Sequence, residues 1–247
     1  MISIKTPQEI ELMRQSGKIL LHVLQEMEKQ VRPGISTKEL DTIAEEIIRS
    51  SGAVPTFKGY HGFPGTLCTS INDQVVHGIP SDDEVLKEGD IIGVDCGVTY
   101  KGLITDACRT FIAGDVSPEV RHFVDITKKS LENAIQMVKP GGFIGDISYE
   151  IQRTLEEYGY SPVIECTGHG VGKELHEAPE ILNVGKSGTG PEIHTGMTFA
   201  IEPISTMKSG EIMTLPDKWT IVTRDGSLSA HFEHTVAVTG KGMEIIV

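Results

Sequence analysis

One set of landmarks recurs in this chain at a constant spacing. The segment Val31–Gly34 reads VRPG, and VKPG stands at Val138–Gly141. Gly52, which ends the next helical pattern, has its counterpart in Gly159 at the same spacing. In each copy two helical patterns precede β-rich segments, which is typical of an internal duplication. The repeat therefore predicts two similar half-domains that face each other across a pseudo-two-fold axis.

Capping signals locate the helices of each half. Thr6 and Glu9 form a capping box, as do Ser36 and Glu39, and apolar residues follow each box at helical spacing. Proline and glycine then end each pattern. We expect helices from Thr6 to Arg32, from Ser36 to Gly52, from Ser117 to Lys139 and from Asp146 to Gly159, within a single domain of residues 1–247 that divides at roughly 1–115 and 116–247.

Residues 91–112 read as a β-hairpin with two acidic residues. The positions of Asp95 and Asp106 differ by an odd number, and across an even-length turn this odd separation puts both carboxylates on one face. Gly93 and Gly97 flank Asp95 on that face and would leave room beside it, whereas the opposite face is apolar. Two neighbouring carboxylates repel unless a cation or a shared proton stabilises them. The hairpin therefore predicts a metal site.

The repeat supplies a second pair of acids. Asp95 maps at the same spacing onto Glu202, which ends an alternating pattern typical of a half-buried strand. Its partner is expected to be Glu233, after a long insertion. Four carboxylates in one pocket can hold two divalent ions bridged by a water. Oxygen ligands alone would favour magnesium, calcium or manganese, whereas a histidine ligand would favour manganese, iron, cobalt or zinc.

Nine histidines leave the choice of a nitrogen ligand open. His169 lies in a glycine-rich turn, His176 follows soon after it, and His77 precedes another turn. Each fits a structural role as well as a functional one, and His61 and His234 are weaker candidates. The other four are expected to pack, to lie on the surface or to have no assigned role: His22, His122, His194 and His231.

Composition excludes several classes of protein. The net charge is −13, from 22 basic and 35 acidic residues, which disfavours a broad nucleic-acid or anionic-membrane surface. No apolar run approaches the roughly 20 residues of a membrane span, and the N-terminus lacks the pattern of a signal peptide. Four cysteines without CxxC pairing indicate a reduced, cytoplasmic protein. The motifs of α/β-hydrolases, P-loop proteins and dinucleotide-binding domains are absent.

Five sequence blocks, in order, resemble the type I methionine aminopeptidases of bacteria. They are TSINDQVVHGIP, the hairpin described above, TGHGVGKELHEAP, FAIEP and FEHTVAV, and the resemblance covers essentially the whole chain. It implies an α/β (α+β) pita-bread fold, in which two pseudo-symmetric helix-helix-strand halves surround a central curved antiparallel sheet in one catalytic domain. It also implies that two divalent ions (Co, Mn, Fe or Zn) are held by Asp95, Asp106, His169, Glu202 and Glu233.

The resemblance further implies a reaction. The initiator methionine would be removed from nascent chains with a small second residue, by attack of metal-activated water on the first peptide bond. Glu202 would also shuttle protons, His77 would lie near the substrate amine or the attacked nitrogen, and His176 would stabilise the carbonyl oxygen. The methionine side chain would enter a pocket formed by Phe57, Tyr60, Phe63, Cys68, Leu175 and Trp219.

The same resemblance sets further expectations and leaves two alternatives. Gly93 and Gly97 would let ions and peptide in, and a monomer would meet nascent chains near the ribosome, transiently and without binding nucleic acid or membrane itself. A peptidase that cleaves before proline would share fold and metals, but the pocket lining and the lack of an extra N-terminal domain argue against it. A catalytically inactive module that binds RNA or protein would usually lose metal ligands, and all five matches are present.

Overall fold

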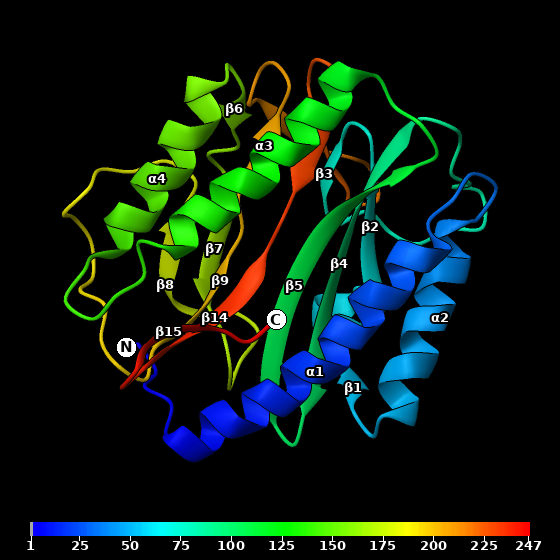
Figure 1. The fold of residues 1–247 in the computed structure, drawn as a ribbon. Helices are drawn as coiled ribbons and strands as arrows, with labels where there is room; N and C mark the ends of the chain where they lie inside the picture. The colour runs from blue at the N-terminus through cyan, green and yellow to red at the C-terminus, as the bar shows by residue number, and fades with distance from the viewer. Residues whose placement is uncertain (1) are drawn as a thin grey trace.

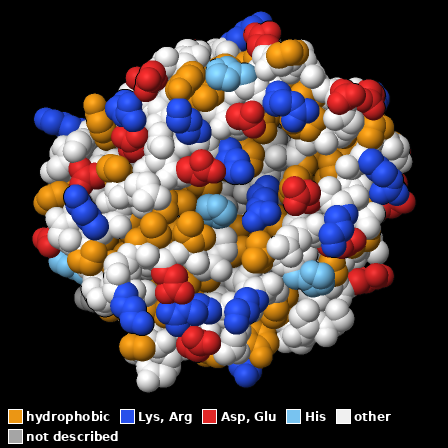
Figure 2. Space-filling model, viewed as in Figure 1, with side chains coloured by type: hydrophobic (Ala, Val, Ile, Leu, Met, Phe, Trp, Pro, Cys, Tyr) orange, Lys and Arg blue, Asp and Glu red, His pale blue; other side chains and the backbone are white. Residues whose placement is uncertain are grey.

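Four long helices cover one face of the strands in this computed structural model, which describes residues 2–247 (Figure 1). No helix in the described part of the chain is long and apolar enough to cross a membrane. The face that carries the helices has basic and acidic side chains interspersed (Figure 2). The helices are α1 (Pro7–Gln30), α2 (Thr37–Ser50), α3 (Pro118–Ile135), α4 (Ile144–Glu157) and a short 3-10 turn, η1 (Tyr60–Gly62).

The predicted capping boxes form at α1 and α2. The hydroxyls of Thr6 and Ser36 accept from the backbone N–H groups of Glu9 and Glu39, whose carboxylates accept from the cap residues in return. The prediction for α3 is too long, because the helix ends at Ile135. The next three N–H groups donate to carbonyls three residues back rather than four, so the chain tightens before the Lys139-Pro140 turn.

All strand pairs are antiparallel, as expected. In the first half, β4 lies between β1 and β2 and also pairs with β5; in the second half the order is β15-β14-β9-β7-β8. Two small sheets, β13-β10-β6 and β11-β12-β3, complete the set. The strands are β1 (Val54–Pro55), β2 (Leu67–Ile71), β3 (Gln74–Val76), β4 (Asp90–Tyr100), β5 (Leu103–Ala113), β6 (Ser161–Pro162), β7 (Thr167–Gly170), β8 (Glu177–Leu182), β9 (Thr198–Ile201), β10 (Ile204–Thr206), β11 (Ile212–Thr214), β12 (Ile221–Thr223), β13 (Ser229–His231), β14 (His234–Thr239) and β15 (Gly242–Ile245).

The helix pairs pack on the two sheets in the same way. Residues of α1 and α2 cover β2 and β4, and residues of α3 and α4 cover β9 and β14. Helices α2 and α4 each have 14 residues, and their first residues are separated by the spacing of the sequence repeat. Gly52 and Gly159 follow them with φ of 72° and 78°. These equal spacings support the proposed division at about residue 115, which stays a prediction.

Candidate metal centre

The β4-β5 hairpin has the predicted register. Its turn residues, Lys101 and Gly102, both have positive φ, as a tight two-residue turn requires. Asp95 stands opposite Cys108 and Asp106 opposite Gly97, so the two carboxylates are diagonal neighbours on one face. The other face is buried beneath α1 and α2, with Ile92, Val94, Cys96 and Val98 all 0% exposed.

Gly97 has a different role from the one expected. A β-carbon there would lie 2.8 Å from Cε1 of Phe57, whereas one at Gly93 would make only ordinary contacts. The expectation that both glycines let ions and peptide in is therefore wrong at Gly97, because an aromatic ring fills that space. The missing side chain lets the ring of Phe57 pack directly on β4.

The second pair of acids lies in the second half, directly beside the paired strands β9 and β14. Glu202 follows β9, and Glu233 stands between β13 and β14. The backbone N–H of Glu233 donates to the carbonyl of Cys108 at 2.9 Å, which joins this segment to β5. Thr235 strengthens the junction, since its hydroxyl accepts from the N–H of Asp106 (2.9 Å) and donates to the carbonyl of Asp106 (2.7 Å). These bonds bring the acids of both halves to one place.

His169 is the nitrogen donor that converges with two of these acids. It lies on β7, beside Ala200 of β9. Its Nδ1–H donates to the carbonyl of Gly170 at 3.0 Å, which leaves the lone pair of Nε2 free. Nε2 lies 3.5 Å from Oε1 of Glu202. One ligand atom each from Asp106, His169 and Glu233 lie within 4.8 Å of one another, all buried.

The centre is electrostatically incomplete without a cation. Buried oxygens of Asp95, Asp106 and Glu233 have no hydrogen-bond partner within residues 2–247. Burial raises the pKa of Asp95 to about 7 and the pKa of Glu202 to about 8. Burial and the neighbouring carboxylates also raise the pKa values of Asp106 and Glu233. Carboxylates that resist ionisation and lack partners are suited to a divalent ion, so the residues fit the predicted metal.

The thirteen site residues predicted from the sequence line one cavity of about 1050 Å³. Around its aromatic wall the ring centroids of Phe63 and Trp219 are 5.1 Å apart. The hydroxyl of Tyr60 is hydrogen-bonded to Nδ1 of His176 at 3.0 Å, and the rings of His176 and His169 are 4.4 Å apart. The cavity lining includes Phe57, Tyr60, Phe63, Cys68, His77, Asp95, Asp106, His169, Leu175, His176, Glu202, Trp219 and Glu233.

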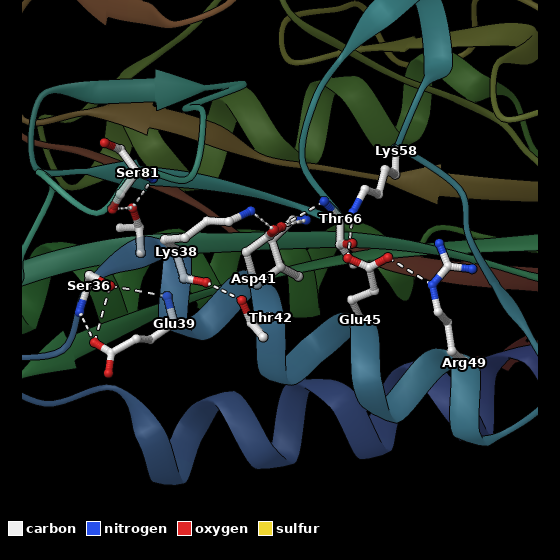
Figure 3. A network of polar contacts seen from close by, with 12 residues as sticks. Ser36, Lys38, Glu39, Asp41, Thr42, Glu45, Arg49, Lys58, Thr66 and Ser81 are labelled. Atoms are coloured by element: carbon white, nitrogen blue, oxygen red, sulfur yellow. Dashed lines mark hydrogen bonds and ion pairs between the residues drawn. The ribbon is translucent and has the colours of Figure 1, made fainter.

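Helix α2 holds the aromatic wall in place (Figure 3). The buried carboxylate of Asp41 accepts from the backbone N–H groups of Thr66 (2.7 Å) and Leu67 (3.0 Å), at the start of β2. One turn later, the carboxylate of Glu45 pairs with Lys58, next to Phe57. The loop that carries Phe57, Tyr60 and Phe63 is thus tied to the helix at both ends.

Three histidines of the cavity, His77, His169 and His176, are neutral at neutral pH. Burial lowers the pKa values of His77 and His169 to about 4, and burial also lowers the pKa of His176. A neutral imidazole can give or accept a hydrogen bond without bringing a charge close to the substrate amine. His61 lies exposed at the rim of the same cavity.

Two other histidines differ from the expectations. His234 faces a second cavity, of about 600 Å³, and its Nδ1–H donates to the carbonyl of Val247. His231, which received no role, lines the first cavity with a side chain that is only 5% exposed. The signal that could have found it is the strand period, since His231 stands two residues before Glu233 and so shares its face.

Comparisons with known proteins agree with this architecture. The model of metallopeptidase family M24 matches residues 11–240. The chain is 47% identical to a methionine aminopeptidase of Clostridium acetobutylicum, over 100% of this chain and 98% of that one. It is 44% identical to the methionine aminopeptidase of Escherichia coli, over 99% and 93% of the two chains.

Solved structures give the same result. The crystal structure of a methionine aminopeptidase from Thermotoga maritima superposes with a TM-score of 0.98 at 45% identity, over 100% of this chain and 99% of that one. A prolidase from Pyrococcus furiosus, at 23% identity and a TM-score of 0.78, shares the fold over 98% of this chain and 64% of its own. The predicted pita-bread fold is confirmed. The chain belongs to metallopeptidase family M24, among the methionine aminopeptidases, as the five sequence blocks predicted.

Proposed function

We propose that this cavity removes the N-terminal methionine from polypeptides whose second residue is small. The observation that carries the proposal is the buried group of Asp106, His169 and Glu233 at an apolar, aromatic pocket. A methionine side chain is flexible and polarizable, and a wall of aromatic rings with the sulfur of Cys68 suits it. The same chemistry applies to every such N-terminus, so nascent polypeptides are the proposed substrates.

The proposed metal ligands are Asp95, Asp106, His169, Glu202 and Glu233. Their four carboxylates and one imidazole fit two divalent ions, with manganese, iron, cobalt and zinc favoured by the nitrogen donor. Such ions would lower the pKa of a water ligand and polarise the substrate carbonyl. The unpartnered oxygens of Asp95, Asp106 and Glu233 support this assignment.

The chain's own residues would handle protons and orientation. Glu202, whose carboxylate lies beside His169 in the proposed centre, would accept and release the proton of the attacking water. His176, hydrogen-bonded to Tyr60 and edge-to-face with His169, would donate to the oxygen of the attacked carbonyl. His77 is neutral and would lie near the substrate amine or the attacked nitrogen. The aromatic wall would exclude water from the methionine side chain.

The cellular setting follows from this proposed substrate. Initiator methionine is exposed as a chain leaves the ribosome, so we propose that the protein acts in the cytoplasm as a monomer, with transient ribosome contact. We do not assign it a nucleic-acid or membrane partner of its own.

A peptidase assay tests the proposed function. We expect release of methionine from Met-Ala and Met-Gly peptides when manganese, cobalt, iron or zinc is supplied, and little cleavage of Xaa-Pro peptides. Preferred cleavage of the Xaa-Pro series would instead favour a prolidase-like activity. Folded protein that binds metal but releases no methionine with any of the four metals would reject the proposal.

A further inference from the structure

His231 has an unpaired nitrogen inside the metal centre. Its Nε2 is buried without a hydrogen-bond partner among residues 2–247, and it lies 3.4 Å from Oε2 of Glu202. A buried donor left unpaired costs about 1–3 kcal/mol. This nitrogen is therefore expected to gain a hydrogen-bond partner in the active form of the centre.

Two imidazoles bracket the carboxylate of Glu202. Nε2 of His169 lies 3.5 Å from Oε1, and Nε2 of His231 lies 3.4 Å from Oε2. Among residues 2–247, His169 belongs to the group of converging ligand atoms, whereas His231 does not. Oε1 thus faces the proposed metal position, and Oε2 faces His231. A ligand carboxylate is commonly oriented by a hydrogen bond to its second oxygen.

The backbone of His231 is fixed, so only its side chain can adjust. Its N–H donates to the hydroxyl of Thr110 at 3.0 Å, and the same hydroxyl donates to its carbonyl at 2.8 Å. The thiol of Cys108 also donates to that carbonyl, at 3.6 Å. A shift of a few tenths of an ångström in either side chain would bring Nε2 and Oε2 to hydrogen-bond distance.

We propose that His231 is a positioning residue that donates from Nε2–H to Oε2 of Glu202 and thereby aims Oε1 at the metal. The arrangement needs the tautomer opposite to that of His169, which carries its proton on Nδ1. The proposal rests on the proposed role of Glu202 as a ligand and proton carrier.

Two variants of similar shape test this role. In His231→Gln the amide nitrogen stands near the position of Nε2 and can donate, whereas His231→Met has similar length and no donor. We expect His231→Met to lose about 10- to 100-fold in kcat and in calorimetric manganese affinity, with KM within about threefold. His231→Gln should retain both within a few-fold. His234→Gln, in the second cavity, should match the wild type.

Several outcomes would overturn the proposal. One is a folded His231→Met with wild-type manganese affinity and kcat, and another is a His231→Gln as impaired as His231→Met. A third is the loss of one bound ion in His231→Gln, which would make the imidazole a metal ligand. If His231→Met fails to fold, His231→Asn replaces it, because its amide nitrogen stops near the position of Nδ1. Manganese affinity needs no substrate, so the test stands even if the wild type releases no methionine.

Discussion

At the scale of single residues, the carboxylates of the centre repel one another unless a cation or a proton lies between them. Four carboxylates lie in a buried space, and three of them have an oxygen without a hydrogen-bond partner in the described part of the chain. The backbone of Asp106 is fixed, because Thr235 binds both its N–H and its carbonyl. The backbone that carries this carboxylate is therefore in place before metal arrives, which lowers the entropy cost of binding.

Asp106→Ala should abolish methionine release and weaken manganese binding. The change removes one of the three converging ligand atoms but keeps the backbone bonds to Thr235. Activity should fall by at least about a thousandfold, as expected when an essential group is lost. Calorimetry and a peptide assay measure the two effects, and an active, fully metal-loaded variant would contradict the assignment of Asp106 as a ligand.

The stability of the metal-free protein should depend on pH through Glu202. Its pKa is raised from 4.5 to about 8 in the folded state, so the folded state binds the proton more tightly than the unfolded state. Stability from this group is full below about pH 4.5 and is lost as pH rises to about 8. Glu202→Gln removes the effect, so the Tm of this variant relative to wild type should rise over that range.

Added manganese should reverse this trend in the wild type. Metal displaces protons from the carboxylates, so its affinity should increase with pH and the Tm of the loaded protein should rise with it. A constant Tm difference between wild type and Glu202→Gln from pH 5 to pH 8, without metal, would show that Glu202 does not hold a proton in the folded state.

At the scale of elements, α2 determines the shape of the substrate pocket without touching the substrate. Asp41 on this helix binds the N–H groups of Thr66 and Leu67, and Glu45 pairs with Lys58 (Figure 3). Cys68, which lines the cavity, follows directly on the same strand. The helix and the pocket wall should therefore move as one unit.

Asp41→Ala should destabilise the protein and raise KM. Two buried N–H groups lose their acceptor, which costs roughly 2–4 kcal/mol, and the wall they hold would loosen. Thr42→Ala is the matched control, because Thr42 is exposed on the same helix and bonds only the carbonyl of Lys38; it should change stability by less than about 0.5 kcal/mol. Thermal unfolding and steady-state kinetics decide, and equal effects of the two changes would reject a positioning role.

Local rules explain which parts of the architecture were predictable. Capping boxes located α1 and α2, and the parity of the turn placed Asp95 and Asp106 on one face. Contacts between distant segments were not predictable in this way. The ring that covers Gly97 comes from Phe57, which belongs to a separate loop far earlier in the chain. His231 shares the face of Glu233 by strand period, but only folding brings it to Glu202.

At the scale of the whole molecule, the two proposed halves meet along β5 and the segment from His231 to Thr235. The contacts there are hydrogen bonds of Thr110, Cys108 and Thr235, all of them buried. The metal ligands lie on both sides of this seam. Parting of the halves would therefore separate the ligands, and we expect metal to stabilise the whole domain.

Thr235→Val should weaken this seam. Valine has a similar shape but cannot bond the backbone of Asp106, so we expect a loss of about 1–2 kcal/mol and lower manganese affinity, within one cooperative transition. Thr239→Val, at the far end of β14 in the turn toward Gly242, should cost stability without changing manganese affinity. Denaturant unfolding followed by Trp219 fluorescence and circular dichroism checks both; two separate transitions would contradict a single domain.

The packing of Phe57 on Gly97 has a consequence for how substrates are selected. Phe57 covers β4 two residues from Asp95, and Cys68 stands opposite Asp95 on β2, so two walls of the pocket are built on the strand that carries a carboxylate of the centre. A substrate side chain that fills the pocket would restrict the motion of that strand, whereas a shorter one would restrict it less. Peptides with N-terminal norleucine and alanine should then differ in kcat as well as in binding affinity, because the better-fitting side chain would also stabilise the transition state.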